Sequence, residues 1–191
     1  MDITESFISL VLQALKFAAH KHRQQRRKDK EASPYINHPI YVAELLWRVG
    51  QVRDVTILTA AILHDTIEDT DTNPIEIESL FGKEVLSLVQ EVSDDKSLPK
   101  EIRKQLQVQK APYKSIGAKH IKLADKICNV HDISHSPPSN WSLQRRKEYL
   151  DWTEKVVAGL RGSNQALEDY YDHTLAQARE MLAAETQSQN D

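Results

Sequence analysis

The sequence of 191 residues contains a single cysteine, only five glycines and no long apolar run. One cysteine can form neither a disulfide framework nor a cysteine-based zinc cluster, so we expect a reducing, cytoplasmic location. Five glycines fall far below the average of about 7%, which favours a helical fold over a β-sandwich or barrel. No stretch approaches the roughly 18 apolar residues of a membrane span, and the N-terminal residues lack a signal-peptide pattern. We therefore expect no membrane partner.

A surplus of positive charge is also missing, because 28 acidic residues outnumber 25 basic ones and give a formal net charge of −3. This balance argues against a broad nucleic-acid-binding surface, which would be globally basic. The length suits one domain, which we place at residues 1–185, followed by a polar C-terminal tail at residues 186–191. The sequence does not indicate an oligomeric state.

Helical periodicity dominates the chain, and no segment shows the period-two alternation of a half-buried strand. We predict an all-α, single-domain bundle of about eight or nine helices. Asn37 is typical of a helix cap, with Pro39 in the first turn, and Gly82 is expected to interrupt a helix. The predicted helices cover approximately residues 7–18, 37–49, 52–66, 74–92 (broken at Gly82), 99–108, 117–134, 141–160 and 164–185.

The pair His64-Asp65 stands directly after the apolar run 60–63, within a segment that the pattern predicts to be buried. A buried carboxylate is costly unless a cation or hydrogen bonds compensate it. Glu68 and Asp69 follow one turn later, so one helix end carries an imidazole and three carboxylates. Like charges this close repel each other unless a cation lies among them, which points to a metal site.

Two other positions complete a plausible ligand set. His38 lies at a predicted helix start, and Asp125 lies in an apolar helix with Asn129 one turn further on. Each group alone has a structural reading, such as a core histidine, a helix cap, or a salt bridge from Asp125 to Lys126 or Arg145. Together, two imidazoles and two carboxylates form a mixed nitrogen and oxygen set that suits Mn²⁺, with Fe²⁺, Zn²⁺ or Co²⁺ as other choices.

A basic run at residues 21–30 precedes His38 and includes Arg27 and Lys28. Such a run is often a solvated face or a localisation signal. Beside a metal site it also suits a polyphosphate substrate, because arginine offers a planar fork for phosphate. Further candidate contacts are Lys96, Lys100, Arg145 and Tyr149, while Cys128 is interpreted as a buried, inert thiol.

The order His38, His64-Asp65, Asp125 resembles the HD superfamily of metal-dependent phosphohydrolases. The surrounding segments 22–29, 34–39, 64–70 and 123–129 resemble the hydrolase domain of RelA/SpoT-type alarmone enzymes, above all the free-standing small alarmone hydrolases that include the SpoT homologues of animals. The similarity continues through segments 94–100 and 141–149, and it covers about residues 5 to 170.

This resemblance implies Mn²⁺-dependent removal of the 3′-pyrophosphate from guanosine tetra- and pentaphosphate, releasing pyrophosphate with GDP or GTP. Adenosine alarmones are a further substrate class, and no synthetase domain is expected within this length. By matched position, the resemblance assigns metal binding to His38, His64, Asp65 and Asp125, and water activation to Glu68 and Asp69. It assigns substrate contacts to Arg27, Lys28, Asn129, Lys100, Arg145 and Tyr149. Ser33 before Pro34 and Cys128 before Asn129 depart from the family pattern, on the nucleoside side of the pocket.

Two other functions are compatible with the same residues. One is a phosphatase of the same superfamily that acts on NADPH or a nucleoside monophosphate and releases orthophosphate. The other is a non-enzymatic adaptor that binds a nucleotide or nucleic acid through the basic run. The intact Glu68-Asp69 pair argues against an inactive enzyme.

Overall fold

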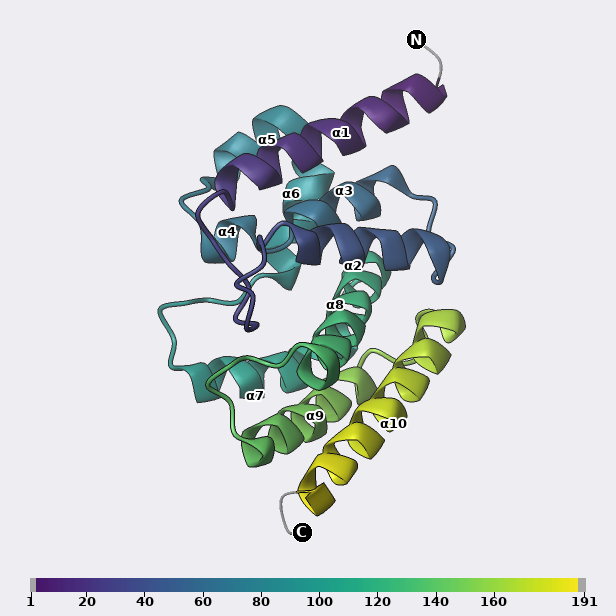
Figure 1. The fold of residues 1–191 in the computed structure, drawn as a ribbon. Helices are drawn as coiled ribbons and strands as arrows, with labels where there is room; N and C mark the ends of the chain where they lie inside the picture. Colours follow the sequence, from purple (N-terminus) through teal and green to yellow (C-terminus); the bar gives the residue numbers. More distant parts are fainter. Residues whose placement is uncertain (1–2, 189–191) are drawn as a thin grey trace.

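The computed structural model describes residues 3–188, and this part of the chain contains helices but no strand (Figure 1). The predicted all-α class is confirmed, with one helix more than the pattern indicated because a single turn at residues 66–69 stands alone. The α-helices are α1 (Ile3–Lys21), α2 (Asn37–Arg48), α3 (Val55–Leu63), α4 (Thr66–Asp69), α5 (Pro74–Phe81), α6 (Lys83–Val92), α7 (Lys100–Lys110), α8 (Ile116–His135), α9 (Leu143–Ala158) and α10 (Gln165–Ser188), with a 3₁₀ turn at Ala111–Tyr113. Residues 186–188 of the expected tail therefore belong to α10, and residues 189–191 lie outside the described part.

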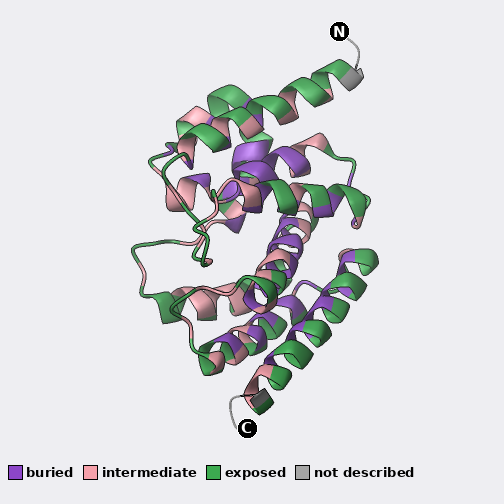
Figure 2. Cartoon of the chain, in the orientation of Figure 1, coloured by how far each residue is buried: buried purple, intermediate pink, exposed green. Residues whose placement is uncertain are grey.

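Helix α8 connects the two halves of the fold (Figure 1). It packs against α2, α3 and α6 on one side and against α9 and α10 on the other. Because neighbours surround it, α8 buries ten of its residues, among them Leu123, Ala124 and Ile127. Helix α3 is also buried along most of its length (Figure 2), which explains its nearly continuous apolar sequence. None of the described helices is long and apolar enough to cross a membrane.

Local sequence signals set several helix boundaries. Asn73 and Glu76 form a capping box at the start of α5, with Pro74 in the first turn. Gly82 adopts a φ of 89°, which a side chain would disfavour, and this separates α5 from α6 as predicted. The expected Asn37 cap is wrong, because Ile36 holds the cap position of α2 without a side-chain hydrogen bond.

The prediction of one helix over residues 52–66 is also wrong, because α3 ends at Leu63 and the chain turns at His64 and Asp65. Two side chains replace the missing backbone donors at this helix end. His64 Nδ1 donates to the carbonyl of Ala61 at 2.7 Å, and Thr66 Oγ1 donates to that of Leu63 at 2.7 Å. These bonds satisfy carbonyl groups that the helix would otherwise pair, so the chain can leave the helix without an unpaired buried oxygen.

A buried hydrogen bond joins α9 to α10 and yields a stability prediction. Thr153 Oγ1 lies 2.9 Å from Tyr171 Oη, and both residues are fully buried. Thr153 donates its own hydrogen to the carbonyl of Leu150, so Tyr171 is the donor in the pair. Thr153→Val leaves the buried tyrosine hydroxyl without an acceptor and should lower the free energy of unfolding by about 1–3 kcal/mol. Tyr171→Phe removes the hydroxyl itself and should lower it by about 1 kcal/mol. Urea unfolding measures both variants, and equal losses would contradict this donor assignment.

Candidate metal centre and nucleotide cleft

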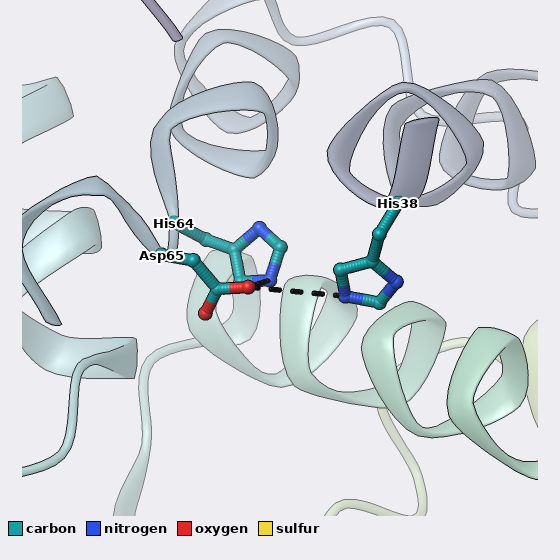
Figure 3. A group of neighbouring side chains, drawn as sticks. All are labelled: His38, His64 and Asp65. Carbon is teal, nitrogen blue, oxygen red and sulfur yellow. Dashed lines mark ion pairs between the residues drawn. The ribbon is translucent and has the colours of Figure 1, made fainter. Parts of the chain in front are cut away.

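Three side chains from two parts of the chain converge beside α8 (Figure 3). His38 comes from the first turn of α2, and His64 with Asp65 comes from the turn after α3. Their donor atoms all lie within 4.8 Å of one another. Asp65 Oδ2 is 2.9 Å from His64 Nε2 and 3.9 Å from His38 Nε2. This confirms that the chain brings together a group able to hold a metal ion.

The orientation of His64 fits a metal ligand. Its Nδ1 atom donates to the carbonyl of Ala61, which leaves the lone pair of the neutral ring on Nε2. That Nε2 atom is buried and faces the Asp65 carboxylate, with Oδ2 at 2.9 Å. An imidazole fixed through one nitrogen by a backbone carbonyl, with its other nitrogen facing carboxylate oxygens, is the usual arrangement of a metal-bound histidine. The donor set of two imidazoles and a carboxylate therefore fits a divalent ion.

Asp125 borders this group from α8, 61 residues later than His64 in the chain. Its Oδ1 atom lies 3.1 Å from His38 Nε2 and 3.9 Å from His64 Nε2. Both carboxylate oxygens have other partners, because Asn129 donates to Oδ1 at 2.6 Å and Lys126 donates to Oδ2 at 2.9 Å. Asp125 thus lies where a fourth ligand is expected, and its role as a ligand stays a prediction.

The electrostatics of the cluster favour a cation among its members. Burial alone would lower the pKa of His64, but the carboxylate of Asp65, assisted by Asp125, raises it to about 9. Burial opposes the charge on Asp65, yet the two imidazoles hold the pKa of this carboxyl well below its usual range. In the metal-free protein, a proton on His64 therefore takes the place of a positive ion.

This proton predicts a pH effect in chelator-treated protein. Because the folded-state pKa of His64 is about 9 and the unfolded value is about 6.5, the contribution to stability is complete below about pH 6.5. It is lost as the pH rises to 9, by up to about 3 kcal/mol. Metal affinity should increase over the same range, since binding releases the proton. Urea unfolding with and without chelator tests this, with the exposed His131→Gln variant as control, and a flat profile in chelator would contradict it.

Glu68 and Asp69 lie at the end of α4 and face the same cleft as Asp65. Glu68 accepts a hydrogen bond from the backbone N–H of Asp94 at 2.9 Å, and burial raises the pKa of Glu68. Asp69 accepts from Lys96 Nζ at 2.5 Å and from Gln25 Nε2 at 3.0 Å. Lys96 also lies 3.5 Å from Glu68, so one ammonium group bridges the two carboxylates, and Arg103 lies 3.7 Å from Glu68 as a second cation.

The cleft has a volume of about 760 Å³ and combines the acidic floor with a basic wall. Five of the six expected substrate-contacting residues line it, namely Lys28, Lys100, Asn129, Arg145 and Tyr149. Arg27 does not line it. Arg27 forms an ion pair with Asp132 and borders an adjoining cavity of about 350 Å³, which shares Lys28 and Tyr149 with the main cleft.

The rest of the basic run points elsewhere. Lys21 pairs with Asp71 at 3.3 Å and with Glu76 at 3.0 Å, on the outside of the fold. Arg23 donates to the carbonyl of His20 at the end of α1, and Arg26 donates to that of Arg23. The run is therefore not a single basic surface.

Sequence reasoning missed an aromatic and cationic wall of the cleft. Tyr149 stands between Trp141 and Trp152, with ring centroids 5.4 and 5.3 Å away. Arg145 lies over the ring of Trp141 at 4.3 Å, and Lys126 lies over that of Trp152 at 4.9 Å. The i, i+4 spacing of Arg145 and Tyr149 indicated one face of a helix, but only the fold brings Trp152 and Lys126 to the same place.

Tyr35 is another residue of the site that was not predicted from the sequence. Its Oη atom donates to Asp65 Oδ2 at 2.5 Å, and its ring lies 5.9 Å from that of His38.

Cys128, expected to be inert, is half-buried in α8, and burial raises the pKa of its thiol. A thiol with a raised pKa is a poor nucleophile at neutral pH.

An all-helical fold in which two buried histidines and a half-buried carboxylate lie beside an acidic pair defines a helical domain with a candidate metal centre. The chain belongs to the HD-domain family, whose model matches residues 14–162. It is 55% identical to the mouse protein named guanosine-3′,5′-bis(diphosphate) 3′-pyrophosphohydrolase MESH1, over 83% of this chain and 89% of that protein. Identity to the human protein of the same name is 53%, over 87% and 93% of the two chains.

Solved structures agree with this family. One, described as a metazoan orthologue of SpoT that hydrolyses ppGpp and plays a role in starvation responses, matches with a TM-score of 0.86 and 46% identity. The match covers 88% of this chain and 94% of that one. A second structure, from Listeria monocytogenes, matches with a TM-score of 0.62 and 26% identity over 76% and 99% of the two chains.

Proposed function

We propose that this protein is a guanosine-3′,5′-bis(diphosphate) 3′-pyrophosphohydrolase that uses Mn²⁺. The observation that carries the proposal is the buried His38, His64 and Asp65 group, which opens with Glu68 and Asp69 into a cleft lined by cations and aromatic rings. The names of relatives that are 55% and 53% identical to this chain over the aligned residues support the same substrate.

In this proposal, His38, His64, Asp65 and Asp125 hold the ion. A bound divalent ion lowers the pKa of water and polarises a phosphoryl oxygen. Glu68 and Asp69 orient the attacking water and accept its proton, and the raised pKa of Glu68 brings this carboxyl closer to the neutral range that suits a general base. Water adds to the phosphorus of the 3′ ester as the bond between this phosphorus and the ribose 3′ oxygen breaks. The 3′ oxygen takes up a proton to become a hydroxyl, and pyrophosphate and GDP or GTP leave.

The basic and aromatic wall would bind the nucleotide. Lys28, Lys100 and Arg145 supply positive charge for the phosphates, and Asn129 lies one turn beyond Asp125. Arg27 would also bind a phosphate group once its ion pair with Asp132 is replaced by one with the phosphate. The rings of Trp141 and Tyr149 offer stacking surfaces, which accept any nucleobase. The proposal therefore includes adenosine alarmones as substrates.

The test is a turnover panel with purified protein and Mn²⁺. We expect pyrophosphate release from guanosine tetraphosphate and from adenosine alarmones, and loss of this release in chelator. Orthophosphate from NADPH, without pyrophosphate from any alarmone, would instead identify a phosphatase. Folded protein without turnover in Mn²⁺, Fe²⁺, Zn²⁺ or Co²⁺ would overturn the proposal, and tight, salt-sensitive nucleic-acid binding in that case would favour an adaptor.

A further inference from the structure

Two residues that the proposed mechanism does not use are connected in series to Asp69. Gln25 Nε2 donates to Asp69 Oδ2 at 3.0 Å. The amide oxygen of the same Gln25 lies 2.6 Å from His22 Nδ1. His22 directly follows α1 and is 2% exposed, so a buried imidazole lies behind the acidic pair without touching the cleft.

The direction of both hydrogen bonds follows from the chemistry of the groups. A carboxylate only accepts, so the amide nitrogen of Gln25 must face Asp69 and the amide oxygen must face His22. The amide oxygen also only accepts, so Nδ1 of His22 must carry the proton. The other ring nitrogen, Nε2, is buried and has no partner in the described structure. Burial lowers the pKa of His22, which keeps the ring neutral in this tautomer.

His22 also packs against Tyr35, a residue that holds a carboxylate of the candidate metal centre. Its ring centroid lies 4.9 Å from that of Tyr35, whose hydroxyl donates to Asp65. The backbone fixes this arrangement, because Gln25 N donates to the carbonyl of His22 at 2.9 Å and Tyr35 N donates to that of Gln25 at 3.2 Å. One buried histidine thus contacts the residues that orient two of the cleft carboxylates.

We propose that His22 and Gln25 are positioning residues that orient the carboxylate of Asp69 toward the attacking water. Gln25 occupies Asp69 Oδ2 from behind, which leaves Oδ1 facing the cleft, where Lys96 lies at 2.5 Å. Without His22, the Gln25 amide can rotate and Asp69 can turn both oxygens to Lys96. This inference rests on the proposed hydrolase function, in which Asp69 accepts a proton from water.

The kinetics of paired variants test this hydrogen-bonded series from His22 through Gln25 to Asp69. His22→Gln moves the side-chain donor one bond further from Cα. We expect kcat to fall by about 10- to 100-fold, as it does when other residues that hydrogen-bond the ligands of a site are replaced. His22→Asn places an amide nitrogen at the same bond distance from Cα as Nδ1, so it should restore most of kcat. Gln25→Met should match His22→Gln, with KM within about twofold of wild type. The same change at the exposed neighbour, Gln24→Met, is the control and should leave kcat unchanged.

A double-mutant cycle separates positioning from a general loss of structure. In an Asp69→Asn background, His22→Gln should lower kcat by less than about twofold, because the group through which it acts is already lost. Mn²⁺ affinity, measured by calorimetry, should be unchanged in the single variants. Full additivity of the two losses, or equal losses in His22→Asn and His22→Gln, would overturn the proposal.

The tautomer of His22 gives a readout that needs no turnover. Long-range proton–nitrogen spectra of ¹⁵N-labelled protein should show Nδ1 protonated, with the signal assigned by its absence in His22→Asn. The signal should shift in Gln25→Met. A proton on Nε2 would overturn the positioning role of His22 and Gln25, whereas failure of the wild type to hydrolyse alarmones would overturn only the proposed function.

Discussion

Asp65→Asn should abolish both metal binding and turnover while the protein stays folded. The variant keeps an oxygen that can accept from Tyr35 Oη, so no buried hydroxyl loses its partner. It removes the carboxylate charge that lies 2.9 Å from His64 Nε2. Losing roughly 4 kcal/mol of metal stabilisation corresponds to a fall in kcat of about 10³-fold or more. Calorimetry with Mn²⁺ and pyrophosphate release measure the two effects.

The same substitution makes a prediction for His64 that is independent of activity. The Asp65 carboxylate is the main group that raises the pKa of His64 toward 9 against burial, so this pKa should fall in Asp65→Asn. Nuclear magnetic resonance titration of the metal-free protein measures it. Asp71→Asn, six residues later and with an 85% exposed side chain, is the matched control. Normal Mn²⁺ affinity in Asp65→Asn would contradict the assignment of this residue as a ligand.

Asp69→Asn should produce the second large loss of turnover, but without a loss of metal binding. Asp69 is not part of the group of potential ligands, and its oxygens contact Gln25 and Lys96. Removing its charge should lower kcat by about 10²- to 10⁴-fold, the usual contribution of a general base. Mn²⁺ affinity should stay near that of the wild type, because the ligands are intact.

The contrast between these two variants distinguishes the two roles. A loss of metal binding in Asp69→Asn would place this residue among the ligands and contradict its role as a base. Asp71→Asn again serves as the control, because it makes the same chemical change on an exposed carboxylate two residues away. Glu68→Gln extends the comparison, and a loss confined to Glu68→Gln would assign proton transfer to Glu68 alone.

The functional residues that could be predicted from sequence are those that break the apolar pattern. His64 and Asp65 interrupt a run of buried side chains, and Asp125 does so in α8. A buried charge needs compensation, so its presence in such a run is informative without any structure. The structure places both histidines and both carboxylates in one cluster, although it shows that His64 and Asp65 lie in a turn and not in a helix.

Residues on the surface of the cleft could not be predicted in the same way. Arg27 and Lys28 are neighbours in the sequence, yet Lys28 lines the cleft whereas Arg27 pairs with Asp132 in α8. Trp152 and Lys126 belong to different helices and meet only because α9 packs against α8. An exposed polar or aromatic side chain satisfies the periodic pattern wherever it points, so the pattern holds no information on its partners.

Composition and periodicity by themselves determined the helical class, the order of the helices and the types of residue at the metal centre, because burial and backbone propensity act locally along the chain. Only the tertiary structure decided how the turn after α3 directs His64 and Asp65 toward His38, and how His22 and Gln25 lie behind Asp69. These arrangements join residues from α2, α4, the turn after α3 and the loop after α1. Their distances depend on how the helices pack, and a single segment cannot encode that packing.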